Sequence, residues 1–229
     1  MEKYLLRKDV HFCCRGDAFV FLDLLHDDYL LLNGVDAASF RQIVNEPAVR
    51  PTSQALTNGP AGMLDQGLLT TDASCGKEIA VTRVVIAVDE LLDPDRSERP
   101  ALSMQHLWRF LYACTRASLQ LRFVQLIRVV RSIEKRKKRR SNGSPVDLAQ
   151  VRTLCALFDR FRMIFPTNYL CLYDSLALIE FLAQYRIFPT WVFGVTLEPW
   201  GAHCWVQHDG YLLNESAEVA SKYSPVMAV

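Results

Sequence analysis

Several features that mark common protein classes are missing from this chain of 229 residues. No two cysteines have the C-x-x-C spacing of a zinc ribbon or a thioredoxin-type redox motif. No run of about 18 apolar residues is free of charge, so we predict no membrane-spanning helix. The stretch Met1–Val10 has neither the apolar core nor the cleavage site of a secretory signal. Since the seven cysteines are odd in number and scattered, we predict reduced thiols and a cytoplasmic location.

An excess of positive or negative charge is also lacking, because the formal net charge is only +1. This balance argues against nucleic acid or a membrane as the main partner. The P-loop pattern G-x-x-x-x-G-K-[ST] does not occur, so no ATP site of that type is expected. Half of the residues are hydrophobic and 22% are charged, which is typical of a globular chain with a substantial core.

Residues 1–75 are expected to form a first domain. Three short apolar runs separated by turn residues predict strands at Val10–Cys14, Ala18–Leu24 and Tyr29–Leu32. Two or three short helices should follow, one beginning at Asp36 and interrupted by Pro47 and Pro51, and another over Pro60–Leu69.

Residues 76–100 are expected to be a connector, in which Ile79–Val88 fits either a strand or the start of a helix. Residues 101–229 should form a second domain. A helical pattern covers Ala101–Ile133, with Leu102, Leu107, Phe110, Leu111 and Cys114 on one face and Leu119, Phe123, Leu126, Ile127 and Val130 on another. A further helix is predicted from Asp147 through Phe161.

The last part of the chain changes its pattern. The sequence predicts a helix over Cys171–Gln184, an apolar strand over Thr190–Leu197, and two strands over Ala202–Gln207 and Tyr211–Asn214. A tight turn at His208–Gly210 should join the last two strands.

This order of elements brings together the groups that a thiol hydrolase needs. A thiol at the first turn of a helix is acidified by the positive helix end, as expected for Cys171. A histidine on the neighbouring strand, His203, would take its proton, and Asn214 or Glu215 on the next strand would orient the imidazole. Taken singly, the first two residues are better explained as a buried core cysteine and a structural histidine, and it is the order of the elements that favours a catalytic pair. Cys204 should face the side opposite to His203, and Cys204, Cys114 and Cys155 are interpreted as core residues.

An ordered set of sequence blocks carries a more specific resemblance. The blocks are CLYDSLAL at 171–178, FGV at 193–195, PWGAHCWV at 199–206, the Asp209–Gly210 turn, and LNE at 213–215. Together they resemble the leader peptidases of lasso-peptide biosynthesis, which are similar in fold to transglutaminases. The resemblance implies that Cys171 is the nucleophile and His203 the general base, with no metal or cofactor.

The third catalytic residue departs from the family pattern. The family has an aspartate after the asparagine, where this chain has Glu215, and it often has an acid where this chain has Gln207. Glu215 is therefore the expected third member, with Asn214 as its substitute, as in papain-like enzymes. The oxyanion hole would include the backbone N–H of Cys171 and a side-chain donor from Asn168 or Tyr169.

The first domain resembles, more loosely, the winged-helix-like element with which such enzymes recognise a leader peptide. The resemblance rests on the Arg15–Asp17 turn, on Asp28–Leu32 and on Leu64–Leu69. An extended leader would add to the edge of the third strand. The residues expected to bind it are Tyr29, Leu30, Leu31, Leu32, Met63, Leu64 and Leu68. The alternative is that these residues form the core of the domain.

These expectations combine into an α+β protein with an N-terminal recognition domain and a C-terminal transglutaminase-like or papain-like cysteine protease domain. It would bind the leader of a lasso-peptide precursor and hydrolyse the bond between leader and core. The resemblance implies an ATP-dependent lasso cyclase as partner. The alternatives are another transglutaminase-like amide hydrolase or amide-forming enzyme, and a non-catalytic peptide-binding adaptor.

The basic run Lys135–Arg140 has three interpretations. It is a solvated helix end running into a loop, a docking surface for an acidic partner, or a nucleic-acid-binding segment. The last lacks interleaved aromatic residues, and no function is assigned to the run.

Overall fold

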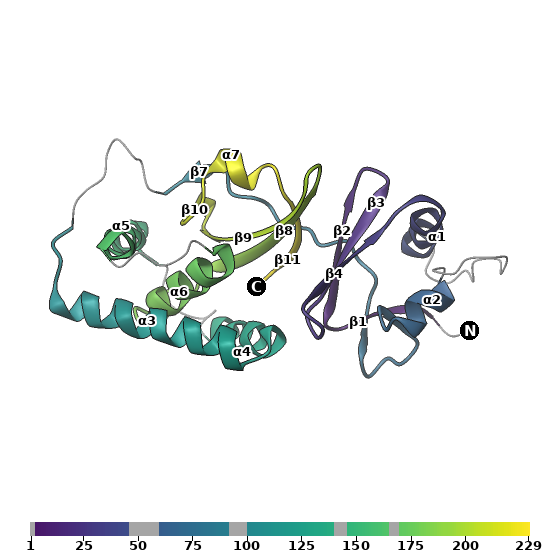
Figure 1. Ribbon diagram of the computed structural model, residues 1–229, viewed down its shortest axis with the longest axis horizontal. Helices are drawn as coiled ribbons and strands as arrows, with labels where there is room; N and C mark the ends of the chain where they lie inside the picture. Colours follow the sequence, from purple (N-terminus) through teal and green to yellow (C-terminus); the bar gives the residue numbers. More distant parts are fainter. Residues whose placement is uncertain (1–2, 46–59, 92–99, 140–145, 165–169) are drawn as a thin grey trace. The chain divides into compact units, whose positions relative to one another are not determined.

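The computed structural model describes residues 3–45, 60–91, 100–139, 146–164 and 170–229. Contacts divide the chain into two compact units. The first comprises Met1–Val84 with Ser224–Met227, and the second comprises Val85–Tyr223 with Ala228–Val229. The division at Val84 falls within the segment 76–100 that was expected to be a connector. Figure 1 labels most of the helices and strands of both units.

The first unit contains two small antiparallel sheets. The three predicted strands are present as β2 (Val10–Arg15), β3 (Ala18–Asp23) and β4 (Asp28–Leu32), and they pair in that order. A second sheet has the order β5-β1-β6 and consists of β1 (Leu5–Arg7), β5 (Leu69–Thr70) and β6 (Gly76–Lys77). These strands of two or three residues were not predicted, because such short segments carry too little alternation to be recognised.

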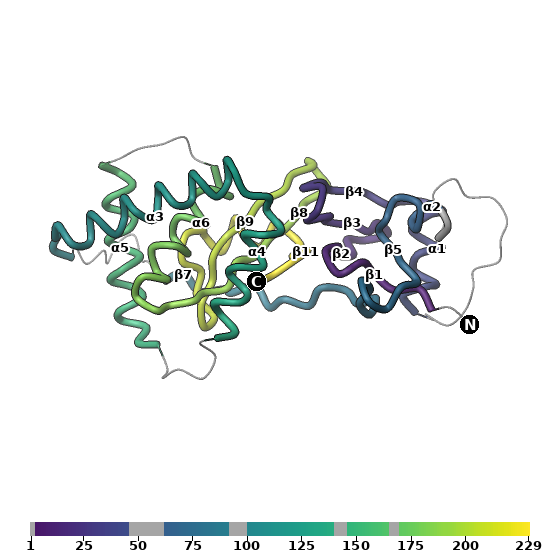
Figure 2. Tube along the Cα trace, turned by 90° about the horizontal axis from the view of Figure 1, so that it is seen from below, coloured from purple at the N-terminus to yellow at the C-terminus, as the bar shows by residue number. Residues whose placement is uncertain are grey.

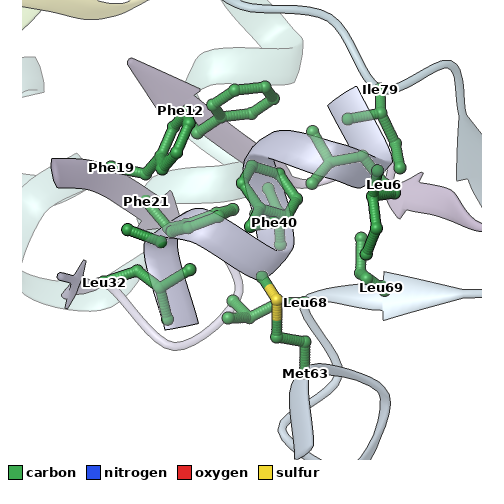
Figure 3. Close-up of a cluster of buried hydrophobic side chains, with 13 residues drawn as sticks. Leu6, Phe12, Phe19, Phe21, Leu32, Phe40, Met63, Leu68, Leu69 and Ile79 are labelled. Carbon is green, nitrogen blue, oxygen red and sulfur yellow. The ribbon is translucent and has the colours of Figure 1, made fainter. Parts of the chain in front are cut away.

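Phe40 packs at the centre of the first unit's core. It lies on α1 (Gly34–Asn45), and its ring centroid is 5.2 Å from that of Phe12 and 5.0 Å from those of Phe19 and Phe21. These three partners lie on β2 and β3, so the cluster fixes the helix on the sheet (Figure 3). Edge-to-face ring contacts of this kind add to the free energy gained from apolar burial.

The helix predicted over Pro60–Leu69 is shorter than expected, because α2 covers Pro60–Asp65. Gly67 adopts a left-handed conformation with φ of 69°. The N–H groups of Gly67 and Leu68 bond back to the carbonyls of Leu64 and Met63, at 2.9 Å each. This hydrogen-bonded end stops the helix, and Leu69 then enters β5. Pro47 and Pro51 lie outside the described residues.

The described residues of the second unit form four long helices and one short one. They are α3 (Met104–Phe123), α4 (Leu126–Lys138), α5 (Leu148–Ile164), α6 (Cys171–Ala183) and α7 (Ala217–Ala220). The helix predicted over Ala101–Ile133 is broken at Val124, which is extended at φ −123° and ψ 130°. Leu119 and Phe123 are exposed, whereas Leu126, Ile127 and Val130 are buried. The expected common face is wrong, since these residues belong to two helices.

The sheet of the second unit contains β8 (Thr190–Leu197), β9 (Trp200–His208), β10 (Tyr211–Leu212) and β7 (Asp89–Glu90) as neighbours in that order. β9 is antiparallel to both of its neighbours, β8 and β10, and β10 is parallel to β7. The predicted turn after β9 has positive φ at Asp209 and Gly210. The strand or helix expected over Ile79–Val88 is wrong, because this segment is irregular until β7.

The helix α6 lies against β9 and between α3 and α5, with most of its residues buried (Figure 2). The last strand, β11 (Ser224–Ala228), includes residues of both units. Within the parts of the chain that the structure describes, every helix is too short or too polar to cross a membrane.

Two residues of the basic run turn inward. Arg136 donates two hydrogen bonds of 2.8 Å to the buried carboxylate of Glu180. Lys137 donates to Thr190 Oγ1 at 2.8 Å. The interpretation of the whole run as a solvated helix end is therefore wrong at these two positions. Lys135, Lys138 and Arg139 are exposed, and Arg140 lies outside the described residues.

Candidate active site

Cys171 is the first residue of α6 and follows the N-cap residue Leu170. The backbone N–H groups of the first helical turn have no acceptor within their own helix, so they create a positive end. This end stabilises a thiolate more than a thiol. The side chains of Cys204 and His203 and the backbone of Cys204 also stabilise the charged form of this thiol.

His203 lies on β9, opposite Gly194 of β8. Its ring centroid is 5.1 Å from that of Tyr223 and 6.3 Å from that of Trp205. The Sγ of the next residue, Cys204, lies 3.9 Å from Ser175 Oγ on α6. Cys204 and His203 line the same pocket. Cys204 and Cys155 are buried as expected, whereas Cys114 is only half-buried.

Glu215 contacts the imidazole of His203. Its Oε2 lies 2.6 Å from His203 Nε2, and its other oxygen accepts a hydrogen bond of 2.9 Å from the N–H of Ser216. Since Nε2 faces the carboxylate, Nδ1 is the ring nitrogen left for the hydrogen bond with Cys171. The imidazole of His203 is thus hydrogen-bonded to Glu215 and interacts with the thiol of Cys171.

Asn214 makes different contacts. Its Oδ1 accepts from the N–H of Val206 at 2.8 Å, and its Nδ2 donates to Ser175 Oγ at 3.1 Å. The amide thus links β9 to α6. The structure brings Glu215, and not Asn214, to the imidazole of His203.

Gln207 makes hydrogen bonds that hold neighbouring segments together. Its Oε1 accepts from the N–H of Ala87 and from Trp205 Nε1, and its Nε2 donates to the carbonyl of Val85 at 2.8 Å. The side chain thereby holds the segment that precedes β7. Asn168 and Tyr169, the expected side-chain donors to an oxyanion, lie outside the described residues.

The electrostatics of the site favour a charged pair. Hydrogen bonds from Cys204 and from His203 lower the pKa of Cys171 to about 4. The hydrogen bonds of His203 with Cys171 and with Glu215 raise its pKa to about 9. Burial keeps the pKa of Cys204 well above its ordinary value, so this thiol stays protonated and can donate to Cys171. Between a pH of about 4 and a pH of about 9, the stable state of the pair is a Cys171 thiolate beside a His203 imidazolium.

The sequence analysis did not predict that Cys204 belongs to the candidate site. Its buried strand position gave the correct prediction of a core side chain, but the contact with Cys171 depends on how α6 lies on β9. Its place directly after His203 was the one available signal.

A pocket of about 610 Å³ opens beside these residues. Cys171, His203, Cys204, Asn214 and Glu215 line one part of it. The remaining lining residues are Glu90, Phe158, Asp159, Arg162, Met163, Asp174, Leu212, Leu213 and Ser216. No three His, Cys, Asp or Glu side chains of the described ranges form a group suited to a metal ion.

The residues predicted to bind a leader all lie in the first unit. Leu32, Met63 and Leu68 belong to its buried core, and Leu30 and Leu64 pack against that core. Tyr29 is half-buried, and Leu31 is exposed to 45%. In the sheet order β2-β3-β4 the strand β4 lies at an edge.

Comparison with known proteins gives one match. No curated protein and no solved structure matched the chain. The family model of the transglutaminase-like superfamily matches residues 111–228, which is more than half of the chain and includes Cys171, His203 and Glu215. With this match over the helix and sheet that carry the site, the chain belongs to the transglutaminase-like superfamily.

Proposed function

We propose that the chain is a cysteine peptidase that removes the leader from a ribosomally made lasso-peptide precursor. The observation that carries the catalytic part is the place of Cys171 at the start of a helix and beside a pocket, where it interacts with His203, whose imidazole lies 2.6 Å from Glu215. Membership of the transglutaminase-like superfamily supports acyl transfer to a thiol. The ordered blocks between Cys171 and Glu215 support the narrower choice of a leader peptidase.

The reaction begins with attack of the Cys171 thiolate on the scissile carbonyl carbon. The negative charge that develops on the carbonyl oxygen is stabilised by the backbone N–H of Cys171, which has no acceptor within its helix. His203, as imidazolium, gives its proton to the leaving amine. Water, deprotonated by the now neutral imidazole, then hydrolyses the thioester and restores the thiolate.

The leader would bind along β4. This strand ends its sheet, so its outer N–H and C=O groups are available to pair with an extended peptide. Leu30 and Leu32 point toward the core of the unit, and the exposed Leu31 is the outward side chain that a leader residue would contact. Met63 and Leu68 would act indirectly, by supporting the fold beneath the strand.

Freeing the N-terminus of the core peptide provides the amine for ring closure. In the proposed pathway an ATP-dependent lasso cyclase forms the macrolactam from this amine. The chain has no P-loop pattern of its own.

Cleavage of a full-length lasso precursor by the purified protein tests the peptidase activity, with the products identified by mass spectrometry. We expect a single cut at the junction of leader and core, and complete loss of cleavage in C171A. The matched control is C14A, since Cys14 is an exposed thiol in the first unit. Cleavage by C171A at the wild-type rate would contradict the proposal.

A pair of leucine substitutions tests the leader-binding role. L31E introduces a charge on β4, whereas L25E changes a leucine of similar exposure, 42% against 45%, outside the strands. We expect L31E to raise the KM for the precursor about tenfold and L25E to leave it unchanged, with equal activity of both on a peptide that contains only the junction. An unchanged KM for L31E would instead favour a leader-independent amide hydrolase.

A further inference from the structure

An ion pair joins the two helices that border the pocket beside Cys171. Arg162 lies in the last turn of α5, and its Nη2 faces Oδ1 of Asp174 in the first turn of α6. Both side chains are largely buried, at 11% and 8% exposure. The guanidinium also lies over the ring of Tyr173, 5.9 Å from its centroid. Of the described residues that line the pocket, Arg162 alone carries a permanent positive charge.

Asp174 is placed where its charge opposes the thiolate. It follows Cys171 by three residues on α6, so the two side chains lie on the same face of the helix. Both groups become negative on ionisation, and each makes ionisation of the other less favourable. The pKa of Asp174 is raised, first by burial and also by the neighbouring Cys171, while Arg162 acts in the opposite direction.

Several other ionisable groups line the pocket beside Asp174 and Cys171. His203 and Cys204 extend from β9, Glu215 follows β10, Glu90 lies on β7, and Asp159 lies on α5. His203 and Glu215 pair with each other, and Cys204 stays protonated. Burial raises the pKa of Asp159 to about 6, and Arg162 partly opposes this rise. Without Arg162 the α5–α6 side of the pocket would hold carboxyl groups and no cation among the described residues.

We propose that Arg162 is a positioning residue for Cys171, which neutralises the Asp174 carboxylate and so allows the thiolate to form beside it. Asp174 in turn holds the guanidinium at the start of α6. The pair rests on the proposed role of Cys171 as nucleophile. It adds a second electrostatic support to the thiolate, independent of His203.

Two roles of the pair predict different results. If the pair only holds α5 against α6, then R162M and D174N both break the same contact and have the same effect. If it sets the charge around Cys171, the two changes act in opposite directions. R162M exposes the thiolate to Asp174, whereas D174N leaves the positive charge of Arg162 uncompensated.

The pH dependence of alkylation by iodoacetamide separates these roles without any peptide substrate. The rate is followed between pH 3 and 9 by mass spectrometry of the peptide that contains Cys171, in the full-length protein. We expect R162M to raise the midpoint by about one unit, which lowers the rate about tenfold at pH values below both midpoints. D174N should lower the midpoint, and R162K and the double variant R162M/D174N should return it close to the wild-type value.

The matched control is R152M, because Arg152 is exposed on α5 and does not line the pocket. It should leave the midpoint unchanged. If R162M and D174N shift the alkylation midpoint in the same direction, the Arg162 proposal is overturned, while the proposed role of Cys171 as nucleophile stands. An ordinary thiol midpoint near pH 9 in the wild-type protein would overturn the nucleophile role and the Arg162 proposal together. If R162M does not fold, the D174N variant alone tests the proposal. An alkylation midpoint of D174N that is raised or unchanged contradicts the charge role of the pair.

Discussion

Glu215 Oε2 and His203 Nε2 lie 2.6 Å apart, and both side chains are about four-fifths buried. The contact fixes the orientation of the imidazole and assigns its other nitrogen to Cys171. A glutamate side chain at position 215 therefore reaches the imidazole of His203. The second oxygen of Glu215 is held by the N–H of Ser216, which limits the freedom of the longer side chain.

The Glu215→Gln variant should lose activity at a lower alkaline pH than the wild-type protein. The hydrogen bonds of His203 with Cys171 and Glu215 raise its pKa to about 9. Replacing the carboxylate by an amide removes part of the support for the imidazolium, so its pKa falls. The alkaline limb of kcat/KM, where the imidazolium loses its proton, should move to lower pH by about one unit.

The acid limb should stay near its wild-type position, because it follows the thiol of Cys171, whose pKa is lowered first by Cys204. Glu218→Gln is the control, since Glu218 is an exposed carboxylate paired with Lys222. An alkaline limb that is equally displaced in both variants would contradict the role of Glu215.

Asn214→Ala should affect stability and leave the pH profile in place. The amide bonds with the N–H of Val206 and the hydroxyl of Ser175, and the variant leaves both without this partner. Loss of such partly buried bonds costs about 1–3 kcal/mol of the free energy of unfolding, measurable by urea denaturation. A displaced alkaline limb in this variant would instead indicate that Asn214 supports the imidazole of His203.

The sequence predicts the elements of the candidate site better than their contacts. The positions of Cys171 at a helix start and His203 on a strand follow from periodicity and order, and the structure has α6 and β9 there. Asn214 and Glu215 are adjacent in the chain, so periodicity gives no basis for choosing between them, and only the family resemblance favoured Glu215. Their contacts depend on how the segment after β10 lies against β9 and α6.

Charged residues were predicted least well, because a charge run in a sequence indicates solvent and not a buried partner. Arg136 and Lys137 turn inward only because Glu180 and Thr190 lie close to them in the fold. The reverse holds for Leu119 and Phe123, whose apolar side chains suggested a packed face but are exposed. The first error comes from tertiary contacts between segments distant in the chain, and the second from the break at Val124, which places Leu119 and Phe123 on a different helix from Leu126, Ile127 and Val130.

Gly194→Ala should disturb the surroundings of His203. A Cβ at this position would lie 2.8 Å from Trp205 Cζ3 and 2.9 Å from Tyr223 Cβ, and both rings pack near the imidazole. We expect a loss in kcat/KM of about ten- to a hundredfold and a lower free energy of unfolding by about 1–3 kcal/mol. Gly201→Ala is the control, because its nearest neighbour would be at an ordinary 3.5 Å. Equal activity of both variants would show that the close approach at Gly194 is unimportant for the site.

Glu180→Gln should destabilise the second unit strongly. The carboxylate is buried and bonds with Arg116 at 2.9 Å, with both Nη atoms of Arg136 at 2.8 Å, and with Gln120 at 3.2 Å. Removing one charge from a buried ion pair costs about 3–5 kcal/mol, because the remaining charges lose their compensation. The free energy of unfolding from urea denaturation should fall by that amount in E180Q. In E78Q it should change by less than about 1 kcal/mol, since Glu78 pairs with Lys3 in an exposed position. Equal stability of the two variants would show that the arginines of α3 and α4 find other partners, and would reduce the Glu180 network to a packing contact.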